Sequence, residues 1–142
     1  MLGTLGLLSW GGCSTATDRA QVNPGPTEDG QQPRPYPHHL DPESVSDVQV
    51  FREVTRLRLT NTTAAAFPPG TLWINRRYAR DVPAFPPGET LELDLTKFVD
   101  EYATAFKAGG FFATRTPDPV VVCELQIGDQ LHPFVIVHDN PE

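Results

Sequence analysis

Arg56-Leu57-Arg58-Leu59-Thr60 is the clearest β-strand signal in the chain. Its polar and apolar side chains alternate strictly, and those of Thr90-Leu91-Glu92-Leu93-Asp94-Leu95 do the same. Successive side chains of a β-strand point to opposite faces of the sheet, so a period of two predicts one buried and one solvated face. This pattern is typical of antiparallel sheets.

On either side of these two segments, the sequence predicts further strands over residues 49–53, 71–75, 78–82 and 131–138. Another is expected over 121–127, where Val121, Cys123, Leu125 and Ile127 form the row predicted to face inward. Val122, Glu124 and Gln126 form the opposite row. Seven short strands at this spacing, within residues 45–142, predict an all-β antiparallel sandwich.

One segment departs from the period of two. Phe98, Val99, Tyr102 and Phe106 recur at helical spacing between Thr96 and Lys107, and Gly109-Gly110 comes next as a stop signal. We therefore expect one short helix here, with its aromatic side chains closing one end of the core.

A pentapeptide occurs twice, as residues 66–70 and 84–88, each reading Ala-Phe-Pro-Pro-Gly just before an expected strand. Proline presets φ and glycine tolerates positive φ, so each copy is predicted to be a turn whose Phe folds back over the edge of the core. Recognition of the proline-rich segment by a partner is the alternative interpretation.

The pattern of expected strands and turns is similar to that of a known class of domain. Leu57-Arg58-Leu59-Thr60-Asn61, Leu72-Trp73-Ile74-Asn75 with Tyr78, and Pro87-Gly88-Glu89 opening an alternating strand resemble a fibronectin-III or immunoglobulin-like bacterial domain. The resemblance covers residues 48–138 and implies a fold rather than a function. It brings no catalytic residues with it.

The N-terminal residues suggest a location. Residues 1–13 are uncharged and largely apolar and end in Gly11-Gly12-Cys13 before Ser14, which resembles the processing site of bacterial lipoproteins. The resemblance implies a signal segment over 1–13 and a lipid on the Cys13 thiol. With the expected sandwich, the whole chain is similar to small cell-envelope lipoproteins that carry one such module. A disordered apolar N-terminus is the alternative.

Residues 14–44 differ in composition from the remainder of the chain. They contain six prolines and only five scattered apolar side chains, too few to offset the entropy of ordering the segment. We therefore expect a disordered linker over 14–44 and a β-sandwich domain over 45–142.

Composition excludes several classes of protein. The net charge of −7 argues against a nucleic-acid binder, and two cysteines are too few for a disulfide scaffold or a four-thiolate zinc site. No apolar run reaches the roughly 18 residues of a membrane-spanning helix.

Catalytic signatures are missing from the sequence. No serine lies in a Gly-x-Ser-x-Gly elbow, and neither a phosphate loop nor a His-Glu-x-x-His motif occurs. Cys123 falls in an apolar row and is predicted to be a buried core residue rather than a nucleophile. His132 and His138 are about 20 Å apart along one expected strand and cannot hold one metal ion together. No cofactor, metal or catalytic residue is expected.

Charge is distributed unevenly along the domain. Between positions 52 and 80 the only acid is Glu53, whereas six arginines occur. Five of them are candidate contacts for an anionic envelope polymer, a lipid headgroup or an acidic protein: Arg56, Arg58, Arg76, Arg77 and Arg80. The alternative is that they lie on solvated faces of two different sheets and pair with the domain's own acids.

Phe111 and Phe112 are the remaining binding candidates. They lie between Gly109-Gly110 and Thr116-Pro117-Asp118-Pro119, so a loop is expected, with one ring entering the core and the other at the surface. The alternative is a loop held down by both rings.

Together these features predict a non-catalytic lipoprotein of the bacterial cell envelope with one β-sandwich interaction module. Its expected partners are the membrane, through the lipid on Cys13, and an envelope protein or anionic polymer. A secreted or periplasmic accessory subunit of a larger complex is the first alternative. A hydrolase or metal-dependent enzyme is the second.

Overall fold

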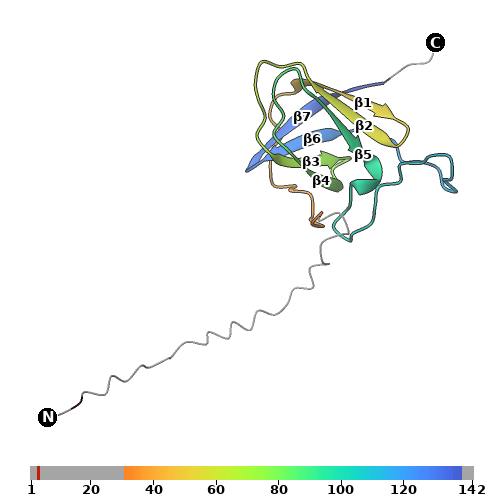
Figure 1. The fold of residues 1–142 in the computed structure, drawn as a ribbon, viewed down its shortest axis with the longest axis horizontal. Helices are drawn as coiled ribbons and strands as arrows, with labels where there is room; N and C mark the ends of the chain where they lie inside the picture. The colour runs from red at the N-terminus through yellow and green to blue at the C-terminus, as the bar shows by residue number, and fades with distance from the viewer. Residues whose placement is uncertain (1–2, 4–30, 139–142) are drawn as a thin grey trace.

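The computed structural model describes residues 3 and 31–138. It contains seven strands: β1 (Ser46–Glu53), β2 (Arg56–Asn61), β3 (Gly70–Ile74), β4 (Tyr78–Val82), β5 (Thr90–Asp94), β6 (Cys123–Ile127) and β7 (Gln130–Val137) (Figure 1). The prediction of an all-β fold with seven strands is confirmed, and each strand lies within three residues of its expected bounds. The described residues contain no helix long and apolar enough to cross a membrane.

The strands form one curled sheet in the order β4-β3-β6-β7-β1-β2-β5. The curl makes it sandwich-like, because side chains of β1, β2 and β5 share one core with those of β3, β4 and β6. Leu57, Leu59 and Leu93 from the first group and Leu72 and Leu125 from the second are all 5% exposed or less.

Strand β7 joins the two groups. Its first half, to Pro133, pairs antiparallel with β6, and its second half, from Phe134, pairs parallel with β1. Pro133 lies at this changeover, where a residue without an N–H removes one ladder hydrogen bond at little cost. The expected purely antiparallel pairing is therefore wrong at β1 and β7, and the sheet is mixed.

The expected helix over 96–107 is also wrong. A single 3-10 turn, η1 (Leu95–Lys97), is present, and the chain then runs extended, with Phe106 N–H donating to the Phe98 carbonyl at 2.9 Å. The buried Asp100 explains the difference, because its carboxylate accepts the N–H groups of Tyr102 and Thr104 and holds a tight turn. Phe98, Val99 and Phe106 are buried as expected, but from a loop, and the expectation is wrong for Tyr102, which is 76% exposed.

The two pentapeptide copies pair with each other. Phe67 and Phe85 exchange both backbone hydrogen bonds, at 3.0 and 2.7 Å, and both rings are buried, as predicted. Gly88 has φ +78°, as its turn requires. Gly70 has another role, because a Cβ there would lie 2.5 Å from the Gln126 carbonyl oxygen, so only glycine allows β3 to approach β6 this closely.

Candidate functional site

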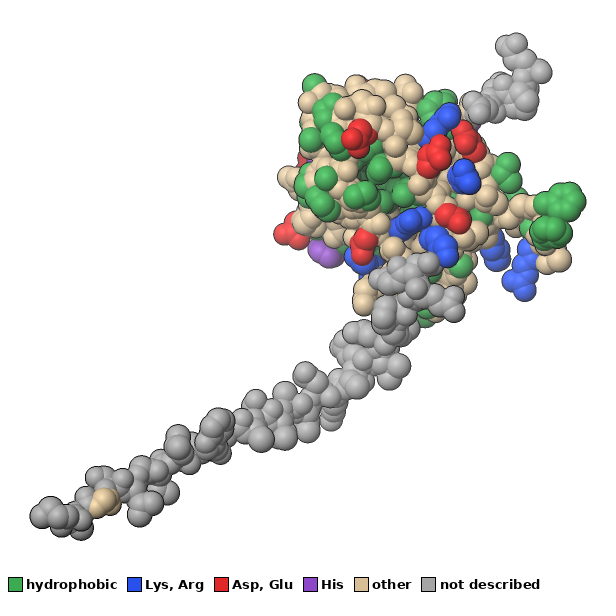
Figure 2. Space-filling view, viewed as in Figure 1, with side chains coloured by type: hydrophobic (Ala, Val, Ile, Leu, Met, Phe, Trp, Pro, Cys, Tyr) green, Lys and Arg blue, Asp and Glu red, His purple; other side chains and the backbone are tan. Residues whose placement is uncertain are grey.

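The most unusual surface of the described chain is a projecting loop, residues 108–118, called here the aromatic loop (Figure 1). Phe111 and Phe112 at its tip are 95% and 90% exposed, and Figure 2 shows hydrophobic side chains standing clear of the molecule at this edge. Their ring centroids are 5.0 Å apart in an edge-to-face arrangement. The expectation that one ring enters the core is therefore wrong.

The neck of the aromatic loop explains why neither ring turns inward. Asp118 N–H donates to the Lys107 carbonyl at 2.9 Å, and the Arg52 guanidinium of β1 donates to the carbonyls of both Ala108 and Asp118. The core beneath the neck is already filled by Phe98, Phe106, Ala108 and Val120. The tip residues lie beyond a closed neck over a filled core, so they point into solvent.

The turn between β1 and β2 lies beside this loop. A Cβ built on Gly110 would lie 3.3 Å from the Thr55 methyl carbon, which places the two segments in contact. Val54, next to Thr55, is 70% exposed and has φ 46°, a conformation that costs a β-branched residue energy. Three exposed apolar side chains therefore belong to two adjoining segments at this end of the sandwich.

The five candidate arginines do not form one cationic face. Arg56 and Arg58 on β2 pair with Glu92 at 3.8 Å and Glu53 at 3.0 Å. The other three lie on the β3–β4 hairpin, in the other half of the curled sheet.

On the hairpin, Arg76 meets Glu124 at 3.4 Å and Arg77 meets Asp100 at 2.8 Å. Arg80 donates to the Asp94 carbonyl at 3.3 Å, and its Nε is buried without a partner among the described residues. Figure 2 shows the same mixture of basic and acidic side chains on the visible face.

A hollow of about 470 Å³ lies beside Arg76 and Arg77; we call it the polar pocket. Its wall is made by three segments, which contribute Pro35, Tyr36, His38, Arg76, Arg77, Asp100, Glu101 and Tyr102. Arg76 and Ala103, on two of the bounding turns, have φ 55° and 63°. Backbone strain of this kind gathers at binding sites, but it also serves tight turns.

The Asp100 carboxylate of the polar pocket is engaged by the protein itself. Asp100 accepts two bonds from Arg77 and two from backbone N–H groups, at 2.8–3.2 Å. Burial favours a raised pKa for Asp100, but the bonds from Arg77, Thr104 and Tyr102 outweigh it and hold the pKa below its usual value. This carboxylate therefore orients the Arg77 guanidinium, and its lone pairs are not open to a substrate.

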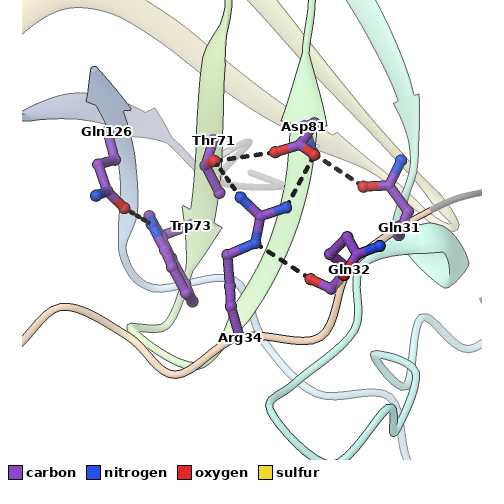
Figure 3. A network of polar contacts seen from close by, with 7 residues as sticks. All are labelled: Gln31, Gln32, Arg34, Thr71, Trp73, Asp81 and Gln126. Carbon is purple, nitrogen blue, oxygen red and sulfur yellow. Dashed lines mark hydrogen bonds and ion pairs between the residues drawn. The ribbon is translucent and has the colours of Figure 1, made fainter. Parts of the chain in front are cut away.

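Residues 31–43, called here the N-terminal strap, lie along strands β4, β3 and β6. Figure 3 shows Arg34 donating to Thr71 Oγ1 and Asp81 Oδ2, both at 2.9 Å, while the Gln31 side-chain oxygen accepts the Asp81 N–H. Trp73 Nε1 donates to the Gln126 side chain in the same view. The expected linker over 14–44 is therefore wrong from residue 31 onward, and residues 14–30 lie outside the described part of the chain.

Tyr36 is the anchor of the strap. Its ring packs edge-to-face on Trp73 at 5.3 Å, and its hydroxyl donates to Glu124 Oε2 at 2.5 Å. Burial, and then the Glu124 carboxylate, raise the pKa of Tyr36 to about 12. Glu124, predicted to lie on the solvated face, is 2% exposed, because the strap covers it.

Sequence reasoning missed Glu124 and Tyr36 as partners. The available signal was the alternation of Arg34 and Tyr36 between prolines, which is typical of an extended segment lying on a surface. The same prolines also led to the prediction of a disordered linker, so this signal was not used.

The other reactive side chains are dispersed. Cys123 is buried, as predicted, and burial raises the pKa of its thiol. His132 packs edge-to-face on Phe67 at 5.8 Å, and His38 lines the polar pocket. Within residues 3 and 31–138, no cluster of three or more His, Cys, Asp or Glu side chains could hold a metal ion. Cys13 lies outside the described residues.

Comparison with known proteins adds no relative: no family model, curated protein or solved structure matches the chain.

Proposed function

We propose that this chain is a non-catalytic lipoprotein of the bacterial cell envelope, held at a membrane by a lipid on Cys13. Its β-sandwich acts as an interaction module whose contact surface is the aromatic loop. The exposure of Phe111 and Phe112, 95% and 90%, is the observation that carries the proposal.

Two adjacent exposed rings are costly in water and are unusual on a monomer. Each could bury apolar area worth about 1.5–3 kcal/mol, and the neck holds both outside the core. Because Arg52 already orders the neck, a partner would not have to order it on binding, and preorganisation of this kind favours affinity. Exposed aromatic side chains on a braced loop are typical of a binding surface.

The contacts of the candidate arginines favour the aromatic loop over the arginines as the contact surface. Four of the five candidates are ion-paired within the chain, and Arg80 donates to a carbonyl. An acidic partner would have to displace these contacts, whereas a partner of the aromatic loop displaces only water. The accessory-subunit alternative would use the same loop, so the two proposals differ in the anchor.

The anchor is tested by metabolic labelling with a fatty-acid probe in a bacterial host, comparing the wild type with Cys13→Ala. We expect label and membrane fractionation in the wild type and loss of both in the variant. An unlabelled wild type would contradict the lipoprotein and favour the accessory subunit.

The contact surface is tested with a photo-crosslinking amino acid at position 112 in living cells. Position 45 is the matched control, because Val45 is 62% exposed and precedes the far end of β1. Adducts from position 112 and none from position 45 are expected. Equal adducts, or none from position 112, would overturn the aromatic loop as the contact surface.

A further inference from the structure

We infer that the partner of the aromatic loop is a lipid bilayer surface with anionic headgroups, into which Phe111 and Phe112 insert. The inference rests on the proposed function, since it names the partner of the same surface. Shape and local charge favour a bilayer over a protein, and the rigidity of the neck is compatible with insertion.

The first reason is the shape of the surface. Specific protein–protein interfaces bury about 800 Å² per partner and about 20–30 residues a side. The exposed apolar side chains here are two rings at the tip of one narrow loop, with Val54 on the adjoining turn. A narrow apolar tip cannot cover a standard protein interface, but it can enter the boundary between headgroups and acyl chains.

The second reason is the local charge. The chain carries a net charge of −7, yet residues 107–118 contain two bases, Lys107 and Arg115, against one acid, Asp118, which lies at the neck and not at the tip. Both basic side chains are exposed, Lys107 at the neck and Arg115 beyond the tip. Basic residues flanking an apolar tip are attracted to anionic lipid by about 1 kcal/mol each near the surface. An anionic bilayer therefore matches the loop, although it repels the domain as a whole.

The third reason is the rigidity of the neck. Arg52 holds both sides of it, and a Cβ at Gly109 would lie 2.8 Å from Pro117 Cβ, so the two sides are packed together. The rings are therefore presented at the end of a fixed stalk. Insertion then requires desolvation of the loop tip and no refolding of the domain.

The test uses the full chain with Cys13→Ala, so that no lipid anchor contributes. Its binding to vesicles of phosphatidylglycerol and phosphatidylcholine in equal parts is compared with binding to pure phosphatidylcholine by co-sedimentation. We expect Phe111→Ser/Phe112→Ser to weaken binding to the anionic vesicles by about tenfold or more, since each 1.4 kcal/mol is tenfold. Lys107→Glu/Arg115→Glu should remove the preference for anionic vesicles.

A second measurement places the ring position in the bilayer. Phe112→Cys in the same background can be labelled with a polarity-sensitive dye, because Cys123 is buried and will not compete for the reagent. On addition of anionic vesicles, the dye should shift to the blue and become protected from an aqueous quencher. Val45→Cys is the control, and its dye should stay exposed.

The outcomes separate this inference from the proposed function. Loss of binding in the Phe111→Ser/Phe112→Ser variant, together with dye protection at position 112 alone, supports insertion. Equal vesicle binding by the wild type and this variant, or no dye protection, overturns insertion. If position 112 then still crosslinks to an envelope protein in cells, the loop is a protein contact and the proposed function stands. If it crosslinks to nothing, the insertion and the aromatic loop as the contact surface both fall.

Discussion

The Tyr36 hydroxyl supplies a hydrogen bond to the buried Glu124 carboxylate. Glu124 lies on a strand face that would be solvated if the N-terminal strap were absent, and the Tyr36 ring covers it while its hydroxyl compensates for the lost water. Without this donor Glu124 would keep only its contact with Arg76 at 3.4 Å, and a buried carboxylate that loses a donor without regaining hydration is destabilised. The side chain that buries Glu124 is thus also the one that satisfies it.

We therefore expect Tyr36→Phe to lower the free energy of unfolding by about 1–3 kcal/mol, the usual cost of a buried charged group that loses its donor. Urea denaturation measures this. Tyr102→Phe is the matched control, since Tyr102 is 76% exposed and its removal should change little. Equal stability of the two variants would contradict the role given to the Tyr36 hydroxyl.

The same hydroxyl predicts a pH dependence. The pKa of Tyr36 is about 12 in the folded protein, above its ordinary value of about 10, so folding favours the neutral phenol. The resulting stabilisation is complete below about pH 10 and is lost as the pH rises through about 12. Between about pH 9 and about pH 11.5, stability should fall further in the wild type than in Tyr36→Phe. Tyr78, whose pKa is also raised, contributes to both proteins and cancels in the comparison.

Among the elements of the fold, the aromatic loop depends on contacts at its neck. Arg52 also lies over the Phe106 ring, 5.7 Å from its centroid, so its guanidinium is held from below by the core and from the sides by two carbonyls. Removing it would leave both carbonyls without their donor.

Arg52→Ala should therefore lower stability by about 1–3 kcal/mol and increase amide hydrogen exchange in residues 107–118. Arg56→Ala is a suitable control, because Arg56 is exposed and its contact with Glu92 is 3.8 Å, a pair worth about 1 kcal/mol or less. Unchanged exchange in the loop of the Arg52 variant would show that the neck is held by other contacts.

Substitutions at two glycines distinguish the cost of backbone strain from the cost of a steric clash. Gly88 and Gly109 both have positive φ, +78° and +85°, but a Cβ meets nothing within 4 Å at Gly88 and meets Pro117 at 2.8 Å at Gly109. Gly88→Ala should cost about 1–2 kcal/mol from the backbone conformation. Gly109→Ala should cost more, because the neck must also open. Thermal unfolding of the two variants gives the comparison, and a smaller loss at Gly109 would contradict the packed neck.

How much of the structure could be predicted from the sequence depends on how far apart along the chain the contacting residues lie. The strands were predictable from the alternation at residues such as Leu57 and Leu59, because a period of two is a local signal with one structural meaning. The helix prediction failed because the spacing of Phe98, Tyr102 and Phe106 is also compatible with two extended segments, and the side chain of Asp100 selects the extended form.

The candidate site also depends on contacts between residues that lie far apart in the sequence. Phe111 and Phe112 were identified from their flanking glycines and prolines, but their outward direction depends on Arg52, about 60 residues earlier in the chain. Glu124 on β6 is contacted both by Arg76 of the β3–β4 turn and by Tyr36 of the strap. Contacts of this range leave no periodic trace in the sequence, so they could not be predicted from it.

For the molecule as a whole, the N-terminal strap is part of the folded domain. With Trp73, Ala79 and Leu131, Tyr36 forms a second buried cluster outside the main core. A variant beginning at Val45 would lack the strap and expose this cluster, whereas one beginning at Gln31 would keep it.

We expect the variant beginning at Val45 to be less stable than the one beginning at Gln31 by at least about 2 kcal/mol, the value of one buried aromatic side chain. Guanidinium denaturation measures the difference, and Trp73 fluorescence should shift to the red as its cover is removed. Equal midpoints for the two variants would show that the domain is complete without the strap.

Strand β7 has a consequence for when the protein can fold. It comes after every other strand in the chain, yet it bonds to β1, the first of them, as well as to β6. While the chain is being made, no strand pairing joins the described strands β1, β2 and β5 to β3, β4 and β6 until β7 has left the ribosome. The closed domain therefore forms only after β7 has been synthesised. Until then, β6 and β1 each lack the neighbouring strand that completes the sheet.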